Sequence, residues 1–78
     1  MNNYVIFDVN RPILEADAIR MAKTPIDAAK AYMKENGIAG TPKRSASNYV
    51  TLSVREFVTR DGVKYYSHKP TQWYEIKN

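Results

Sequence analysis

The sequence predicts an α+β fold, in which a single antiparallel sheet of four to five strands carries one α-helix, residues 25–36, on one face. Residues 25–36 combine a helix start, apolar residues at helical spacing and a glycine stop. Segments rich in β-branched and aromatic residues precede and follow them, and Asp61-Gly62 lies between two such segments, as in a tight hairpin. Because the chain has 78 residues, we expect a single domain, residues 1–78, with one small core.

The first elements precede the helix. Residues 3–9, NYVIFDV, predict a strand, and Pro12 predicts a turn directly after it. Residues 13–23, ILEADAIRMAK, leave two alternatives open. Helix propensity favours a helix, whereas pairing with the first strand favours an extended segment with Ile19 and Met21 on one face. The extended alternative is preferred.

The helix has clear boundaries. Thr24 is a good N-cap, Pro25 suits the first helical position, Asp27 places negative charge in the first turn, and Gly37 ends the helix. The buried stripe is expected to contain Ile26, Ala29, Tyr32 and Met33. Lys30 and Lys34 are expected on the solvent side.

Residues 38–47, IAGTPKRSAS, are expected to form a loop before the hairpin. Asp61-Gly62 predicts a type I′ turn, because that turn needs positive φ at both central positions. After Pro70, residues 73–77 predict a last strand. The turn fixes the register, and the expected pairs are Arg60 with Val63, Thr59 with Lys64, Val58 with Tyr65, Phe57 with Tyr66, and Arg55 with His68.

This register divides the hairpin into two faces. The face expected to meet the helix and core carries Val50, Leu52, Val54, Val58 and Tyr65. The other face carries Thr51, Ser53, Arg55, Phe57, Thr59, Lys64, Tyr66 and His68. Since one helix covers one face of a sheet, we expect the second face to be open to solvent or closed by a partner. Trp73 is expected in the core, and its neighbour Tyr74 at an interface.

The second face is the predicted binding surface. Phe57 and Tyr66 form a cross-strand aromatic pair, which by itself can simply stabilise the hairpin. Cations beside such rings suit stacked bases and phosphates, and equally an acidic protein surface. The candidate partner-binding residues are Tyr49, Arg55, Phe57, Lys64, Tyr66 and His68, with Lys30, Lys34, Lys43 and Arg44 as further basic candidates. For the helix lysines and the dibasic pair, a solvated surface is the simpler reading.

Catalysis is not indicated. With no cysteine and one histidine, His68, the chain has no disulfide and no thiolate or histidine-cluster metal site. No Ser-His-Asp arrangement and no glycine-rich phosphate loop can be read. Asp8, Glu15 and Asp17 lack the alternating spacing of a calcium loop. We therefore expect no enzyme, no metal and no cofactor.

Charge and hydropathy restrict the partners. A formal net charge of +4 favours acidic partners without making nucleic acid the default, and six tyrosines suit an interface. The longest apolar run is short for a membrane span, and the N-terminus does not resemble a signal peptide. We therefore expect a cytoplasmic protein with no membrane partner.

The segments YVIFDV, IRMAKTPIDAAKAYMKENG, YVTLSVREFVTRDGVKYY and WYEIK, which cover most of the chain, carry a resemblance. In this layout the chain resembles small phage-encoded inhibitors. It is similar to anti-CRISPR proteins that block type I surveillance complexes and, more loosely, to phage inhibitors of host RNA polymerase. The resemblance implies a non-enzymatic inhibitor located in the host cytoplasm, and it assigns no individual residue.

The leading functional hypothesis is therefore a small binding protein that docks on a host nucleoprotein complex or on the transcription machinery. One alternative is direct binding of single-stranded nucleic acid or structured RNA by the same face. Another is a structural protein that self-associates through an exposed sheet edge.

Overall fold

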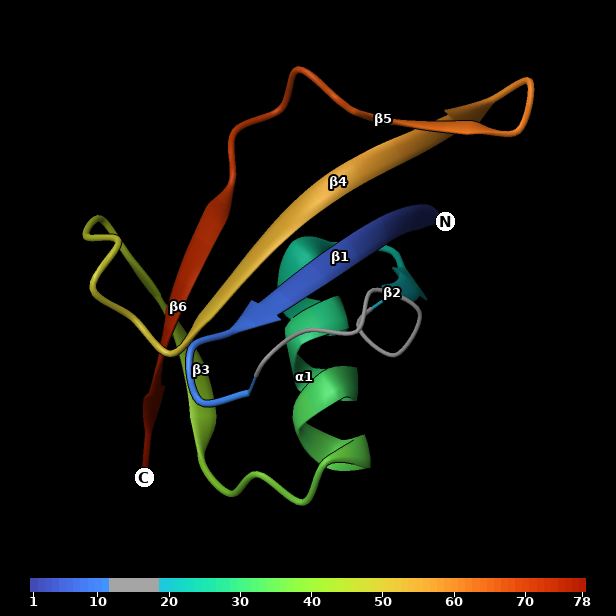
Figure 1. Cartoon of the computed structure of the whole chain (residues 1–78). Coiled ribbons are helices and arrows are strands. Elements are labelled where there is room, and N and C mark those ends of the chain that lie inside the picture. Colours follow the sequence, from blue (N-terminus) through green and yellow to red (C-terminus); the bar gives the residue numbers. More distant parts are fainter. Residues whose placement is uncertain (12–18) are drawn as a thin grey trace.

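The computed structural model describes residues 1–11 and 19–78, and within them one helix packs against one antiparallel sheet of six strands (Figure 1). In chain order the elements are β1 (Asn2–Asp8), β2 (Ile19–Ala22), α1 (Pro25–Glu35), β3 (Thr41–Ser45), β4 (Leu52–Arg60), β5 (Val63–Tyr66) and β6 (Gln72–Lys77). The predicted fold class is confirmed, with six strands in place of four to five. The described part of the chain contains no helix of the length and apolarity needed to cross a membrane.

Strand β4 is the centre of the sheet. The order is β2-β1-β4-β6-β3, and β5 pairs with β4 outside this sequence of neighbours. One edge of β4 pairs with β1, while the other pairs with β6 at Leu52–Val54 and with β5 at Phe57–Arg60. Because β5 and β6 share one edge of β4 at its two ends, the sheet is long, and the molecule measures 41 × 24 × 23 Å.

Helix α1 confirms the sequence prediction. The Thr24 hydroxyl accepts a hydrogen bond from the Asp27 backbone N–H, Pro25 occupies the first turn, and Gly37 has a φ of 65° just after the C-cap. Three residues of the expected stripe are buried and Ile26 is half-buried; the buried set is Ala28, Ala29, Tyr32 and Met33.

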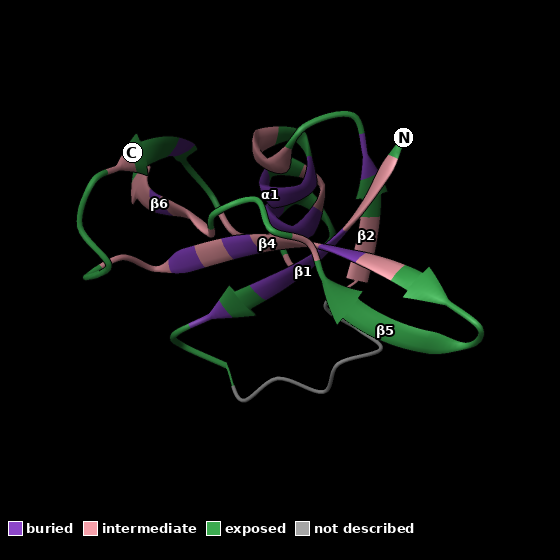
Figure 2. Ribbon diagram, turned by 90° about the horizontal axis from the view of Figure 1, so that it is seen from above, coloured by how far each residue is buried: buried purple, intermediate pink, exposed green. Residues whose placement is uncertain are grey.

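The main core lies between α1 and one face of the sheet, as Figure 2 shows. Ile6, Leu52 and Val54 are at most 1% exposed and form its centre. The expectation for Tyr65 was wrong, because its side chain is 52% exposed. The hairpin carries β5 beyond the region that α1 covers, so no described helix covers this face there (Figure 2). Val50 precedes β4 and is half-buried, and so is Val58.

Residues 41–45 correct a second expectation. They form strand β3 inside the segment that was expected to be a loop, and they pair with β6 from Thr41 and Lys77 to Ser45 and Trp73. β3 is an edge strand, where proline is tolerated because the outward N–H is not needed. Gly40 directly precedes this strand and has a φ of 108°, which favours glycine. A Cβ atom at this position would also clash with Ile76, because it would lie 2.7 Å from Ile76 Cγ2.

The extended alternative for residues 13–23 is confirmed where the structure describes it. β2 spans Ile19–Ala22 and pairs with β1, with Ile19 opposite Val5 and Met21 opposite Asn3. Because residues two apart in a strand share a face, Ile19 and Met21 lie together as expected. Residues 12–18, including Pro12 with its predicted turn, Glu15 and Asp17, lie outside the described residues.

The hairpin has the predicted turn and most of the predicted register. Asp61 and Gly62 have φ values of 51° and 77°, and the four pairs from Arg60 with Val63 to Phe57 with Tyr66 are present. The fifth pair was wrong. β5 ends at Tyr66, the Ser67 N–H donates to the Glu56 carbonyl, and the chain then leaves the sheet before His68.

The connection from residue 67 to residue 71 is held by Glu56. The Ser67 hydroxyl donates to the Glu56 carboxylate at 3.3 Å, and Lys69 Nζ forms an ion pair with the same oxygen at 3.3 Å. The chain rejoins β4 where Gln72 pairs with Val54. Two residues of β4 thus face five of the connection, as in an extended bulge, and His68 does not oppose Arg55.

The assignments of Trp73 and Tyr74 were reversed. Leu52 pairs with Tyr74, so Tyr74 shares the helix-covered face and is 3% exposed. Trp73 pairs with Ser53 on the other face and is half-buried. The alternation was clear in the sequence, but the partner strand determined which residue faces α1.

A candidate binding surface on the helix-free face of the sheet

The candidate site lies on the face of the sheet opposite α1, named here the helix-free face. Register and strand alternation arrange its side chains in rows across the strands. The rows run from the hairpin towards β6 as Thr59 with Lys64; Met21, Asn3, Phe57 and Tyr66; Ile19, Val5 and Arg55; and Phe7, Ser53 and Trp73. Within the described residues, neither a helix nor a strand lies over this face (Figures 1 and 2).

Phe57 is the main correction at this surface. It points to the helix-free face as predicted, yet it is 7% exposed, because it packs with Val5 and Ile19 in a second, smaller cluster. The expectation of an exposed ring was wrong because β2 and β1 bring apolar side chains beside it. A signal was present in residues 3–9, where both alternating sets are mostly apolar, as in strands buried on both faces.

Phe57 and its neighbours form the floor of a shallow groove. The groove has a volume of about 230 Å³ and is lined by Val5, Phe7, Ile19, Phe57, Lys64, Tyr65 and Tyr66. Val5, Phe7 and Ile19 were absent from the site predicted from sequence. Most of the lining is apolar, and Phe7 and Tyr66 at its sides are 37% and 51% exposed. The groove can therefore receive an apolar group from a partner.

Arg55 lies beside the groove on the same face. Its guanidinium carbon is 4.1 Å from the centre of the Tyr66 ring, close enough for a stacked cation–π contact. Its Nε is buried and has no hydrogen-bond partner among the described residues, within which Arg55 also forms no ion pair. Nε is itself out of reach of a ligand, whereas the terminal nitrogens of this oriented guanidinium are not among the buried unsatisfied atoms and are suited to a ligand acceptor.

Lys64 adds a second positive charge at the hairpin end of the groove. Its Nζ is 5.7 Å from the centre of the Phe57 ring, so the charge lies above the groove floor. His68 is exposed on the connection between β5 and β6, outside the groove lining. The fold therefore brings together four of the predicted residues, Arg55, Phe57, Lys64 and Tyr66. His68 follows Tyr66 by two residues in the chain.

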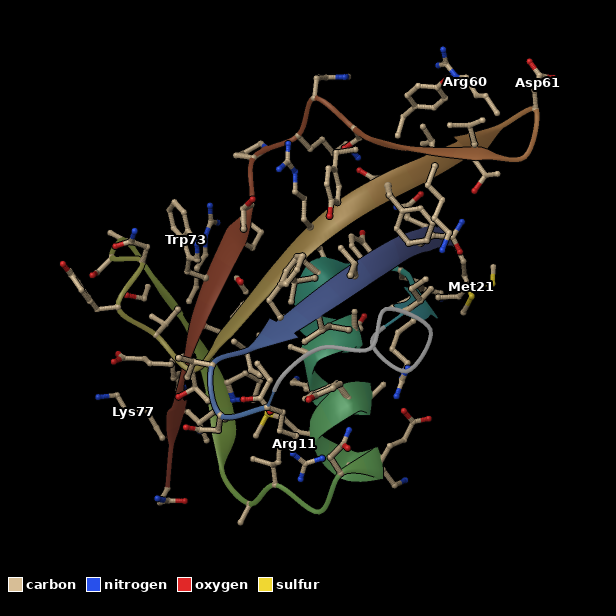
Figure 3. All side chains as sticks on the ribbon, in the orientation of Figure 1. Arg11, Met21, Arg60, Asp61, Trp73 and Lys77 are labelled. Carbon is tan, nitrogen blue, oxygen red and sulfur yellow. The ribbon has the colours of Figure 1, made fainter. Side chains whose placement is uncertain are left out.

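The remaining predicted residues lie elsewhere. Lys30 and Lys34 are exposed on α1, on the other side of the sheet from the groove. Lys43 and Arg44 are exposed on β3, which lies with β6 at the far end of the sheet from the hairpin (Figure 1). Figure 3 shows this separation, with Trp73 and Lys77 at one end and Arg60 and Asp61 at the other. Tyr49, 94% exposed, lies in the loop before β4.

The groups with perturbed acid–base behaviour lie away from the groove. Burial raises the pKa of the Tyr32 phenol, and the hydrogen bond and negative charge of Asp8 raise it further. Burial likewise raises the pKa of Tyr74. Both phenols are in the core under α1. The described residues contain no group of three acidic, histidine or cysteine side chains that could hold a metal ion.

Comparison with known proteins does not assign the chain to a class. No family model, no curated protein and no solved structure matches it. The resemblance to phage inhibitors therefore stays a prediction.

Proposed function

We propose that this is a small non-enzymatic binding protein that docks onto a partner protein through the helix-free face. In this proposal the groove receives an apolar side chain of the partner, and Arg55 and Lys64 pair with carboxylates beside it. The observation that carries the proposal is the Arg55 guanidinium, which is held against Tyr66 at the side of an apolar groove and has no ion-pair partner among the described residues.

The groove supplies the apolar part of the binding. Its floor is already packed, since Phe57 and Val5 are each 7% exposed, so little rearrangement is needed before a partner side chain enters. Burying a leucine- or valine-sized side chain contributes about 1.5–3 kcal/mol. A groove of this size accepts one or two such groups, which suits a local anchor in a larger interface.

Arg55 supplies orientation and selectivity. Its guanidinium is planar and can pair with a carboxylate through two parallel hydrogen bonds. Because it already stacks on Tyr66, less side-chain entropy is lost on binding than for a free arginine. The net charge of +4 adds long-range attraction for an acidic partner.

The particular partner implied by the sequence resemblance, a host nucleoprotein complex or the transcription machinery, is one target of this kind. That partner, the phage origin and the cytoplasmic location remain predictions. The site described above would serve such an inhibitor without any catalytic group.

A displayed library of random twelve-residue peptides, selected on the immobilised protein, tests the proposal. We expect the enriched peptides to combine an apolar residue with acidic neighbours. Their affinity should fall about tenfold or more in Arg55→Met, which keeps an unbranched side chain as far as the position of Nε and removes the charged guanidinium. The matched control is the double variant Lys30→Ala and Lys34→Ala, which removes two charges from the opposite side and should bind as the wild type does. Peptides that bind Arg55→Met unchanged would contradict the proposal.

Single-stranded nucleic acid is a second candidate for the same face, favoured by one observation. Phe7 and Tyr66 are exposed rings on a face that also carries half-buried Trp73 and the Arg55 cation, an arrangement that can stack bases. Fluorescence anisotropy with a labelled single-stranded RNA of mixed sequence distinguishes the two. Tight binding that weakens steeply with salt and depends on Arg55 would replace protein docking with this function.

A further inference from the structure

We infer that the outer edge of β5 binds the partner as an added strand, and that the partner segment is extended and acidic. This inference rests on the proposed function and specifies how the partner is held. The groove would then take side chains from a segment whose backbone pairs with β5.

The first argument is the direction of the β5 backbone groups. In a hairpin closed by a two-residue turn, the pair next to the turn exchanges hydrogen bonds and every second pair along the ladder does the same. The hydrogen bond from the Ser67 N–H to the Glu56 carbonyl, 3.0 Å long, follows this alternation. Val63 and Tyr65 therefore direct their backbone groups to β4, whereas Lys64 and Tyr66 direct theirs outward.

This outward edge is free within the described residues, where β4 is the strand that pairs with β5. It offers two N–H groups and two carbonyl groups in strand geometry, the set that an added strand needs. All four β5 residues are exposed, and Val63, Tyr65 and Tyr66 are 50%, 52% and 51% exposed. β5 is short and carries one charge, Lys64, as protected edge strands do, yet its other three residues are large apolar or aromatic side chains left exposed.

Charge indicates which segment fits. The hairpin and the residues after it carry Arg60, Lys64 and Lys69, against Asp61 in the turn and Glu56, which already pairs with Lys69. An acidic segment is attracted to this edge. A second copy of this chain is disfavoured, because pairing two such edges would bring Arg60 and Lys64 of each copy close together and each copy has a net charge of +4.

The added strand also explains the position of the groove. Every second side chain of the partner would lie on the helix-free face beside Lys64 and Tyr66, and both of these residues line the groove. The Tyr66 ring lies between this new row and Arg55 and stacks with the Arg55 guanidinium, so a partner side chain that enters the groove past Tyr66 comes beside Arg55. One partner segment can thus satisfy the β5 backbone, contact the groove and place a carboxylate near Lys64.

The test uses the backbone directly. Lys64→Pro removes one outward N–H and blocks strand addition, while the hydrogen bonds of Val63 and Tyr65 to β4 are kept. Lys64→Gln is the matched control, because it removes the same charge and keeps the N–H. Binding of the peptides selected from the random twelve-residue library is measured for both variants. We expect Lys64→Pro to bind at least about tenfold more weakly than Lys64→Gln.

Amide hydrogen exchange supplies a readout that needs no variant. In the free protein the Lys64 and Tyr66 amides should exchange fast and those of Val63 and Tyr65 slowly, and the same slow pair confirms that Lys64→Pro is folded. Adding a selected peptide should slow exchange at Lys64 and Tyr66.

The outcomes separate the two proposals. Equal binding by Lys64→Pro and Lys64→Gln, or no protection of the Lys64 and Tyr66 amides, overturns strand addition and leaves an Arg55-dependent groove standing. Enriched peptides without an acidic excess overturn the acidic segment. Concentration-dependent dimerisation that protects the Lys64 and Tyr66 amides overturns the acidic partner segment and shows that a second copy of this chain occupies the edge. A selection without any Arg55-dependent peptide overturns the proposed function together with this inference.

Discussion

The two faces of the sheet take alternate residues from the same strands and bury them to different extents. Under α1, a continuous core joins side chains from β1, β2, β4 and β6 to the helix, and its central residues are at most 1% exposed. On the helix-free face, Val5 and Phe57 form a small cluster with Ile19, and the rings at its margin stay exposed. Among the described residues, α1 closes one face as a second layer, and the other face is closed by its own neighbouring side chains.

This difference separates stability from recognition. On the helix-free face, Phe57 is buried where three strands bring apolar side chains together. Tyr66, opposite Phe57 on the edge strand β5, has a neighbouring strand on one side and remains half exposed. In this cross-strand pair, Phe57 thus forms the buried floor of the groove, and Tyr66 forms an accessible aromatic wall beside it.

The largest expected effect tests the covered face. Leu52→Ala should lower the free energy of unfolding by about 2–5 kcal/mol, because Leu52 is fully buried under α1 and its removal leaves a cavity. Urea denaturation followed by circular dichroism measures the loss. Ser53→Ala, the next residue on the opposite face, is the control and should change stability by about 0.5 kcal/mol or less. Similar losses for the two variants would break the distinction between the faces.

A smaller loss is expected on the helix-free face. Phe57→Ala should lower the free energy of unfolding by about 1.5–3 kcal/mol, because the ring is 7% exposed and packs on Val5 and Ile19. The same denaturation measurement applies, with Tyr66→Ala as the comparison. Tyr66 is 51% exposed and should cost less. If Phe57→Ala proved as mild as an ordinary surface substitution, the second cluster would lose its structural role.

The smallest expected effect concerns a polar contact within the covered face. The Tyr32 hydroxyl donates to Asp8 Oδ2 at 3.0 Å, and Asp8 is 5% exposed. Tyr32→Phe should lower stability by about 1–2 kcal/mol at neutral pH, because a buried carboxylate oxygen loses its donor. Thermal denaturation measures this loss, and Ala31→Gly on the same helix controls for a general weakening of α1.

The pH dependence of this contact has a definite sign. Burial and Asp8 raise the pKa of Tyr32 above its ordinary value of 10.0, so the folded state favours the neutral phenol. Its contribution to stability is fully present below pH 10 and is lost as the pH rises through the raised pKa. Tyr32→Phe should therefore lose less stability than the wild type between neutral pH and pH 11. An unchanged alkaline slope would contradict the coupling; Tyr74, whose pKa burial also raises, accounts for a residual slope.

Local signals predicted the helix and the hairpin turn well. Thr24, Pro25 and Gly37 determine where α1 begins and ends, and Asp61-Gly62 adopts the two positive φ values that the turn requires. Prediction failed where partners distant in sequence decide. β3 became a strand because β6 lies beside it, and Tyr74 is buried because it pairs with Leu52. For the candidate site, the sequence indicated Arg55, Lys64 and Tyr66 on one face and missed Val5, Phe7 and Ile19.

The sequence by itself determined the elements whose causes are local: caps, helical spacing, turn chemistry and the alternation of side chains along each strand. Tertiary structure alone decided the order of the strands. Because that order sets which side chains meet across strands, it placed Phe57 beside Val5 and Ile19 and left the outer edge of β5 without a described neighbour. Burial is a property of the surroundings that distant segments supply, and no single strand carries that information.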